Sequence, residues 1–367
     1  MAGRSPLEIE VRRRIEAAGP MPVAEYMALC LFDREHGYYI TRDPLGTRGD
    51  FITAPEVSQM FGELIGLWAS AVWKQMGAPE NVRLIELGPG RGTMMKDALR
   101  AVRIVPEFHS AIVVHLVEVS PVLQARQEAT LEGCGVTVFW HTRLGEVPKG
   151  PAIIFANEFF DALPVNQAIK TDRGWHERRI QIDGNGQLAF TIAPEPLPFF
   201  QTLLPPHFST ARPGAIFEWR ADTEAMEVGR RVADGRGAAL VIDYGHTETG
   251  IGETFQAVGQ HAYADPLSSP GELDLTAHVD FQALSRAVEA MGVKGFGPIE
   301  QSQFLRRLGI EQRAASLKTK AARPSDIDQA LARLIGRERT AMGELFKVAA
   351  FVHPSIGTPP GFETSTG

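Results

Sequence analysis

Short apolar runs alternate with amphipathic stretches along much of the chain, a pattern typical of a mostly parallel sheet covered by helices. Five such runs are predicted to be core strands: 82–87, 111–117, 136–140, 152–156 and 238–243. Two more runs near the C-terminus, 293–299 and 346–353, are expected to complete the sheet. The pattern therefore predicts an α/β fold with one central sheet.

Other periodicities flank and interrupt this core. Helical spacing of apolar residues predicts helices over 7–18, 23–32, 58–76, 93–102, 119–132, 220–234 and 281–291. A further helix is expected to begin at Ser325, where Ser325-x-x-Asp328 resembles a capping box. Residues 165–192 alternate apolar and polar positions between Asp-Arg-Gly and Asp-Gly-Asn-Gly turns, which indicates inserted antiparallel hairpins.

These changes of pattern divide the chain into five parts. They are an N-terminal helical region with a loop (1–80), a first part of the core (81–164), an inserted antiparallel region with a proline-rich loop (165–220), a second part of the core with an excursion at 246–278 (221–353), and a flexible tail (354–367). The loop-rich stretch 36–56 is equally compatible with a packed surface hairpin and with a lid over a ligand.

The segment after the first predicted core strand carries the strongest chemical signal. Gly88, Gly90 and Gly92 form a tight turn between that strand and a helix that opens at Thr93, as in nucleotide-binding βαβ units. Glycine is needed there because the backbone takes unusual dihedral angles and lies close to a ligand. A glycine triplet alone is also compatible with a purely structural turn.

Two details distinguish this turn from a dinucleotide site. The pyrophosphate fingerprint has its third glycine three residues after the second, where this chain has Thr93. Glu86 stands two residues before the first glycine. A carboxylate there would repel a pyrophosphate but suits the ammonium and sulfonium groups of S-adenosylmethionine (SAM). The spacing Glu-x-Gly-x-Gly-x-Gly resembles the first motif of class I SAM-dependent methyltransferases.

Two further polar groups follow core strands. Glu118 ends the second strand, where an acidic side chain can accept hydrogen bonds from both hydroxyls of an adenosine ribose. Asn157, Glu158 and Asp161 come just after the fourth strand. Ligands of such sheets bind at the carboxyl ends of the strands, so this cluster is predicted to lie near the cofactor. The alternative is a helix cap with solvated acids.

Asp274, His278 and Asp280 are candidate metal ligands by residue type. One histidine without a second nearby is poor support for a metal. An edge strand that runs into an N-cap at Asp280 is the preferred interpretation, and no metal is predicted.

Composition narrows the class of protein. The chain has 367 residues and a net charge of −7, without a long basic run, which argues against a nucleic-acid partner. Two cysteines suggest a reducing compartment rather than a disulfide framework. No apolar run is long enough to span a bilayer. The N-terminus mixes arginines with acidic residues, unlike a transit peptide, so a cytosolic protein is expected.

Six segments in order make a more specific pattern than any one motif. They are Gly49-Asp-Phe-Ile-Thr-Ala-Pro-Glu56, 85–92, 157–164, Val241-Ile-Asp-Tyr-Gly245, Asp274-Leu-Thr-Ala-His-Val-Asp280 and Gly343-Glu-Leu-Phe-Lys347. Together they resemble the MidA family of bacterial and mitochondrial SAM-dependent methyltransferases linked to assembly of respiratory complex I. The resemblance covers about residues 5–353 and implies a class I, Rossmann-like core with a seven-stranded sheet.

The resemblance also implies an activity. Mitochondrial members symmetrically dimethylate an arginine on a core subunit of complex I, so a protein substrate of that kind is expected. The family's SAM positions fall on Gly88, Gly90, Gly92 and Glu118. The complete set predicted to contact the cofactor is Glu86, Gly88, Pro89, Gly90, Gly92, Glu118, Val119 and Asn157. A bacterial member would act in the cytoplasm, and eukaryotic relatives in the mitochondrial matrix.

The predicted function is therefore SAM-dependent methylation of a protein arginine. A guanidinium is a poor nucleophile that carboxylates must clamp and orient. Glu158 and Asp161 are the predicted clamp, with Asp50 of the loop as a third acid. Two alternatives stay open: a small-molecule methyltransferase, and a non-catalytic assembly factor on the same fold.

Overall fold

The computed structural model describes residues 4–42, 53–259, 262–338 and 340–363. Its central sheet has the strand order β15-β16-β10-β5-β2-β3-β4, and β14 (Val279–Asp280) pairs with the end of β10. The bounds are β2 Val82–Leu87, β3 Ile112–Val117, β4 Val138–His141, β5 Ala152–Asn157, β10 Ala238–His246, β15 Lys294–Glu300 and β16 Phe346–Val352. Strands β4, β3, β2, β5 and β10 are parallel, and β16 is antiparallel to both its neighbours. The predicted seven-stranded, mostly parallel core is confirmed.

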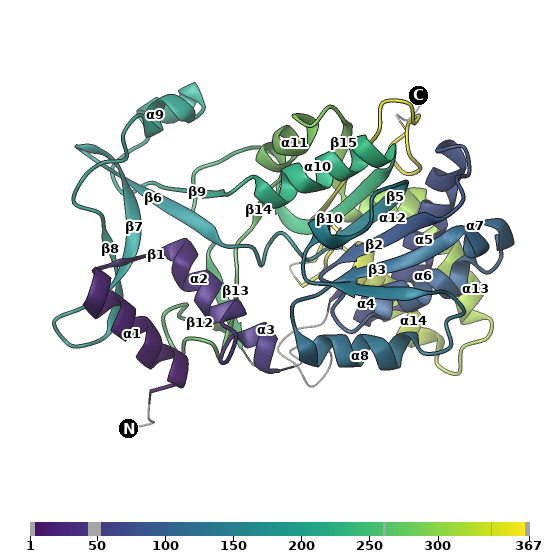
Figure 1. Ribbon diagram of the computed structural model, residues 1–367, viewed down its shortest axis with the longest axis horizontal. Helices are drawn as coiled ribbons and strands as arrows, with labels where there is room; N and C mark the ends of the chain where they lie inside the picture. Colours follow the sequence, from purple (N-terminus) through teal and green to yellow (C-terminus); the bar gives the residue numbers. More distant parts are fainter. Residues whose placement is uncertain (1–3, 43–52, 260–261, 339, 364–367) are drawn as a thin grey trace.

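Helices cover both faces of this sheet (Figure 1). One face packs against α5 (Gln59–Gln75), α6 (Thr93–Val102), α12 (Gln301–Arg307), α13 (Ile310–Lys318) and α14 (Pro324–Ile335). The other packs against α10 (Thr223–Gly235) and α11 (Phe281–Glu289). Strand β5 is buried on both sides, because Ile153 and Phe155 belong to the first core and Ile154 and Ala156 to the second. Helices α7 (Pro106–Ala111) and α8 (Pro121–Leu131) connect the strands at the β4 edge.

The inserted region and the N-terminal helices form a second body beside the core (Figure 1). Strands β6 (Val165–Thr171), β7 (Gly174–Ile182), β8 (Leu188–Ile192), β9 (Ile216–Arg220) and the short β1 (Met21–Pro22) make an antiparallel sheet. Strands β11 (Gln256–Gly259), β12 (Ala262–Ala264) and β13 (Asp274–Thr276) make a third sheet. Helices α1 (Pro6–Ala18) and α2 (Val23–Phe32) share one apolar cluster with both sheets. Three segments far apart in sequence are thus packed as one unit.

Several local predictions differ from the structure. Residues 216–220 form β9, although the helical pattern was expected to begin at Arg220. Helix α14 begins at Pro324, so Arg323 is its N-cap and the capping-box prediction at Ser325 is wrong. Proline is favoured at the first helical position because its missing N–H needs no partner there. Asp280 caps α11 as predicted, since its Oδ1 accepts a hydrogen bond from the Ala283 N–H at 2.9 Å.

Residues 354–363 pack against the core, in contrast to the predicted flexible tail. The Trp68 indole N–H donates to the Pro360 carbonyl at 3.1 Å, and Arg307 donates to the Gly361 carbonyl at 2.9 Å. Phe362 is buried and its ring packs against that of Phe304, with 5.5 Å between centroids. In the part of the chain that the structure describes, no helix is both long and apolar enough to cross a membrane.

Phe362→Ala is therefore expected to destabilise the protein by about 3 kcal/mol, the scale for truncating a buried phenylalanine. Equilibrium unfolding in urea measures the change. Phe199→Ala is the matched control, because Phe199 is 82% exposed and its truncation should change stability by less than about 0.5 kcal/mol. Equal stability of both variants would show that the tail contributes nothing to the fold.

Candidate active site

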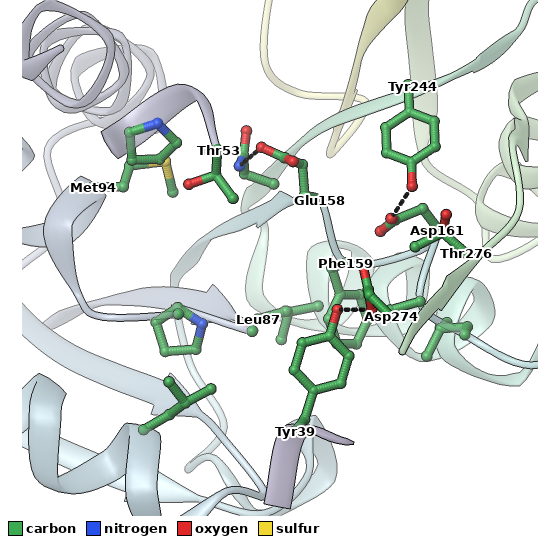
Figure 2. A pocket seen from close by; sticks show the side chains of 18 of the residues that line it. Tyr39, Thr53, Leu87, Met94, Glu158, Phe159, Asp161, Tyr244, Asp274 and Thr276 are labelled. Atoms are coloured by element: carbon green, nitrogen blue, oxygen red, sulfur yellow. Dashed lines mark hydrogen bonds between the residues drawn. The ribbon is translucent and has the colours of Figure 1, made fainter. Parts of the chain in front are cut away.

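A cavity of about 1120 Å³ lies at the carboxyl ends of β2, β3 and β5 and beside the end of β10. Two short helices, α3 (Tyr38–Thr41) and α4 (Ala54–Val57), contribute to its wall together with β13 and residues 340–346. Figure 2 shows labelled side chains from β2, α3, the loop after β5, β10 and β13 around one space. This is the edge of an α/β sheet at which ligands bind.

The glycine turn forms one side of the cavity. Gly88, Gly90 and Gly92 have φ angles of 60°, 54° and 80°, in the left-handed region that favours glycine. A Cβ on Gly88 would lie 3.1 Å from the Phe159 ring, so the turn is also tightly packed. Pro89 lines the cavity with Gly88 and Gly90, whereas Gly92 shapes the turn as the N-cap of α6 without lining the cavity.

Glu118 lies at the end of β3 in a hydrogen-bond network that the sequence did not reveal. Its Oε1 accepts from the Ser120 N–H at 2.8 Å, and its Oε2 accepts from Gln127 Nε2 at 3.0 Å. Gln127 Nε2 also lies 2.7 Å from the Gly90 carbonyl oxygen, and its Oε1 accepts from the Trp140 indole N–H at 2.9 Å. Gln127 therefore joins the glycine turn to Glu118. Burial raises the pKa of Glu118.

Two buried acceptors beside the turn lack a hydrogen-bond partner among the described residues. They are Oε2 of Glu86, at the end of β2, and Oδ1 of Asn157, the last residue of β5. Burial raises the pKa of Glu86 to about 8. Buried acceptors without a partner are costly, so both atoms suit a ligand that brings donors or positive charge.

Glu158 is held in a strained backbone conformation, with φ at 49°. Its Oε1 accepts hydrogen bonds from the Ala54 N–H and from Asn157 Nδ2, both at 3.2 Å. Burial, followed by the nearby charge of Asp161, raises the pKa of Glu158 to about 8. The strain and the raised pKa are features that cluster at functional sites.

Asp161 is fixed by neighbours from β10. Its Oδ2 accepts from the Tyr244 hydroxyl at 2.6 Å, and its backbone N–H donates to Asp243 Oδ2 at 3.2 Å. Its Oδ1 is buried and has no partner in the described chain. Burial raises the pKa of Asp161, while the nearby positive charge of Arg220 opposes this shift.

The second body brings two residues to this cavity that were not predicted as site residues. The Tyr39 hydroxyl, on α3, donates to Asp274 Oδ1, on β13, at 2.8 Å. Both residues line the cavity. The predicted site residues Glu86, Gly88, Pro89, Gly90, Glu118, Val119, Asn157, Glu158 and Asp161 line it too. Asp50, the third predicted acid, falls outside the described residues.

Residues 64–299 match the model of a protein family described as "Putative S-adenosyl-L-methionine-dependent methyltransferase". This is the MidA-type family of the resemblance. The chain belongs to the MidA family. SAM is accordingly its cofactor, and the partnerless acceptors of Glu86 and Asn157 fit the cationic methionine end of that molecule.

Curated relatives of this MidA-family chain cover most of it. It is 39% identical over 353 residues to "Protein arginine methyltransferase NDUFAF7 homolog, mitochondrial" of Drosophila melanogaster, a match that spans 86% of this chain and 78% of the relative. It is 38% identical over 354 residues to the human "Protein arginine methyltransferase NDUFAF7, mitochondrial", across 89% and 78% of the two chains.

A solved structure has the same fold over nearly the whole molecule. It is described as a "likely methyl transferase from Burkholderia thailandensis bound to S-adenosyl-homocysteine". The two chains superpose with a TM-score of 0.85 at 28% identity, over 97% of this chain and 93% of the other. The MidA-family assignment therefore extends to the second body.

Glu118→Ala is expected to weaken SAM binding by about 1.5–3 kcal/mol, the scale of hydrogen bonds to a charged group. The expectation follows from the placement of Glu118 beside the glycine turn, where a ribose would be bound. Calorimetric titration measures the loss. 5′-Methylthioadenosine shares the ribose and should lose a similar amount, so a loss for SAM alone would contradict the ribose role.

Proposed function

We propose that this protein transfers a methyl group from SAM to an arginine side chain of a protein, namely a subunit of respiratory complex I. The curated relatives, named protein arginine methyltransferases, support the reaction. The observation on this chain that carries the proposal is the buried Oδ1 of Asp161, which lacks a partner among the described residues. An acceptor of this kind suits a cationic side chain that brings its own donors.

The cofactor side of the site is assigned to the residues around the glycine turn. The backbone of Gly88, Pro89 and Gly90, in the turn that Gly92 shapes, would hold SAM. Glu118 and Val119 would meet its adenosine, and Glu86 and Asn157 its ammonium group. Gln127 supports these residues, because its side-chain amide donates to the Gly90 carbonyl and to the Glu118 carboxylate. Its role is positional, since it fixes the carboxylate that a ribose would meet.

The substrate side is assigned to Glu158 and Asp161, with Asp50 kept as a predicted third acid. When bound, SAM would supply an electrophilic methyl group and be left as S-adenosylhomocysteine. The two carboxylates would position the guanidinium for this transfer, and alignment of the reacting groups supplies much of the rate. The nitrogen that gains the methyl must release a proton. Glu158, whose pKa burial raises to about 8, can accept that proton at a carboxylate oxygen.

We also propose a location in the cytoplasm of a bacterium. Cys30 and Cys134 are both free in the structure, which is compatible with a reducing compartment. The curated relatives carry "mitochondrial" in their names.

Methyl-labelled SAM, incubated with the protein and purified complex I subunits, tests the proposal when modified residues are mapped by mass spectrometry. Label on arginine of one subunit is the expected result. Label on a small molecule would favour the small-molecule alternative. SAM binding without transfer to any subunit would favour the non-catalytic alternative.

A further inference from the structure

Two tyrosine–aspartate pairs face one compartment of the cavity, on the side of the second body (Figure 2). In one pair the Tyr244 hydroxyl donates to Asp161 at 2.6 Å. In the other the Tyr39 hydroxyl donates to Asp274 at 2.8 Å. The four residues come from β10, the loop after β5, α3 and β13, so the fold brings together four separate segments.

The two pairs lie within electrostatic range of each other. Burial, then Asp274 and then Asp161, raise the pKa of Tyr39 well above its ordinary value. Burial, then Asp161 and then Asp274, do the same for Tyr244. Each tyrosine therefore senses both carboxylates and stays protonated as a hydrogen-bond donor.

Aromatic neighbours hold both tyrosine rings. Tyr39 stacks on Phe32 with 5.9 Å between centroids and meets the Tyr38 ring edge-on at 5.3 Å. Tyr244 meets the rings of His278 and Phe346 edge-on at 5.6 and 5.5 Å. Because rings and hydroxyls are fixed, each aspartate is held in one orientation before a ligand arrives.

Asp161 brings a buried acidic group to this side of the cavity. The lining arginines Arg34, Arg91, Arg143 and Arg333 are exposed or half-buried. The buried Arg220 donates hydrogen bonds to the main-chain carbonyls of Leu163, His278, Asp161 and Ala277, and its positive charge opposes the rise in the pKa of Asp161. No described residue donates a hydrogen bond to Asp161 Oδ1, so this buried acceptor can meet a ligand that brings its own donors.

We propose that Asp161 and Asp274, each fixed by its tyrosine, form the slot that binds the guanidinium of the target arginine. This assignment rests on the proposed function. It replaces Glu158 by Asp274 as the second carboxylate that holds the guanidinium. Glu158, which accepts hydrogen bonds from Asn157 and from the Ala54 N–H, then keeps the role of proton acceptor.

The slot selects arginine over lysine. A guanidinium is planar and offers five donors in a fixed fork, which two rigid carboxylates can bind at once. An ammonium is a strongly hydrated point charge and matches one carboxylate better than two. A ureido group has the shape of the guanidinium without its charge, so citrulline should bind poorly as well. Tyr39 and Tyr244 are positioning residues that act through the aspartates.

The test uses the full chain saturated with S-adenosylhomocysteine and three probes: the N-acetyl amides of arginine, lysine and citrulline. Ligand-observed NMR gives their dissociation constants for the unchanged protein and for Asp274→Asn and Tyr39→Phe. Matched controls at the cavity rim are Glu224→Gln and Tyr263→Phe, the latter at a side chain that is 76% exposed. SAM affinity and melting temperature are measured on every sample.

The arginine probe is expected to bind at least about tenfold tighter than the other two, the scale of one charged hydrogen bond. Asp274→Asn and Tyr39→Phe should each weaken it with SAM affinity unchanged, by about tenfold for Asp274→Asn and less for Tyr39→Phe. The controls should leave it unchanged. Equal binding of the lysine probe, or unchanged arginine binding by both variants, would overturn the slot.

If Asp274→Asn fails to fold, the slot is still tested by the Tyr39→Phe variant and by binding of the three probes to the unchanged protein. Arginine methylation together with normal arginine binding by Asp274→Asn would reject the slot and leave the function standing. Selective arginine binding without methylation of any subunit would reject the function and leave the slot standing.

Discussion

Gly90→Val is expected to abolish SAM binding while the fold remains. Gly90 has a φ angle of 54°, and a β-branched residue there is a backbone outlier that costs about 1–3 kcal/mol. The side chain would also project from a turn that lines the cavity and whose carbonyl meets Gln127 at 2.7 Å. The added bulk at the cavity should lower SAM affinity by more than about 100-fold, as measured by calorimetry, whereas the backbone strain should lower the free energy of unfolding.

The control for backbone strain is Gly77→Val. Gly77 has a φ angle of 86° and open space around it, and it is not among the residues that line the cavity. This variant should lose similar stability in urea unfolding and bind SAM normally. Normal SAM affinity in a folded Gly90→Val protein would remove the cofactor from the glycine turn.

Glu158→Gln is expected to slow methyl transfer by about 30- to 1000-fold with SAM affinity nearly unchanged. The substitution keeps shape and one acceptor but removes the charge and the proton acceptor. Loss of one charged interaction in the transition state, at about 2–4 kcal/mol, gives a change of that size. Single-turnover methylation and calorimetry on the same sample separate the two effects, with Glu224→Gln as the control for an acid at the cavity rim.

The pH profile adds a second readout for Glu158. Its raised pKa leaves the carboxyl neutral below about pH 8 in the free enzyme, so kcat/KM for the protein substrate should rise with pH and level off above about 8. SAM is kept saturating, because Glu86 has a similar pKa and affects cofactor binding. Glu158→Gln should lose this rise. Weak SAM binding by the variant would instead assign Glu158 to the cofactor, and normal values for both would exclude it from the site.

The cofactor half of the cavity could be predicted because its pattern is local. The observed bounds of β2 and α6, Val82–Leu87 and Thr93–Val102, coincide with the predicted ones, and Glu118 follows the next strand. A strand, a glycine turn and a helix are adjacent in sequence, so spacing alone reveals them. Gln127 was missed, although a signal was present: it stands between Leu123 and Leu131 on the buried stripe of α8, where a polar residue needs partners.

The pairing of Tyr39 with Asp274 could not be predicted in this way. The two residues are 235 positions apart, and no local sequence motif around either one indicates that they are in contact. Strand β9 was missed because five residues of alternating pattern after a proline-rich loop are a weak signal. The packed segment 354–363 is short and rich in proline and glycine, and its place in the fold is revealed by contacts such as those with Trp68, Phe304 and Arg307.

These contacts differ in sequence separation, which affects the order in which their two partners are synthesised. The hydrogen bond between Gln127 and Gly90 joins residues 37 positions apart, whereas the one between Tyr39 and Asp274 joins residues 235 positions apart. During synthesis Gly90, Glu118 and Gln127 thus emerge well before Asp274. A chain cut short before β13 lacks Asp274, and it also lacks β16 of the central sheet. Truncation there would therefore leave the glycine-turn sequence intact and remove both the partner of Tyr39 and a core strand.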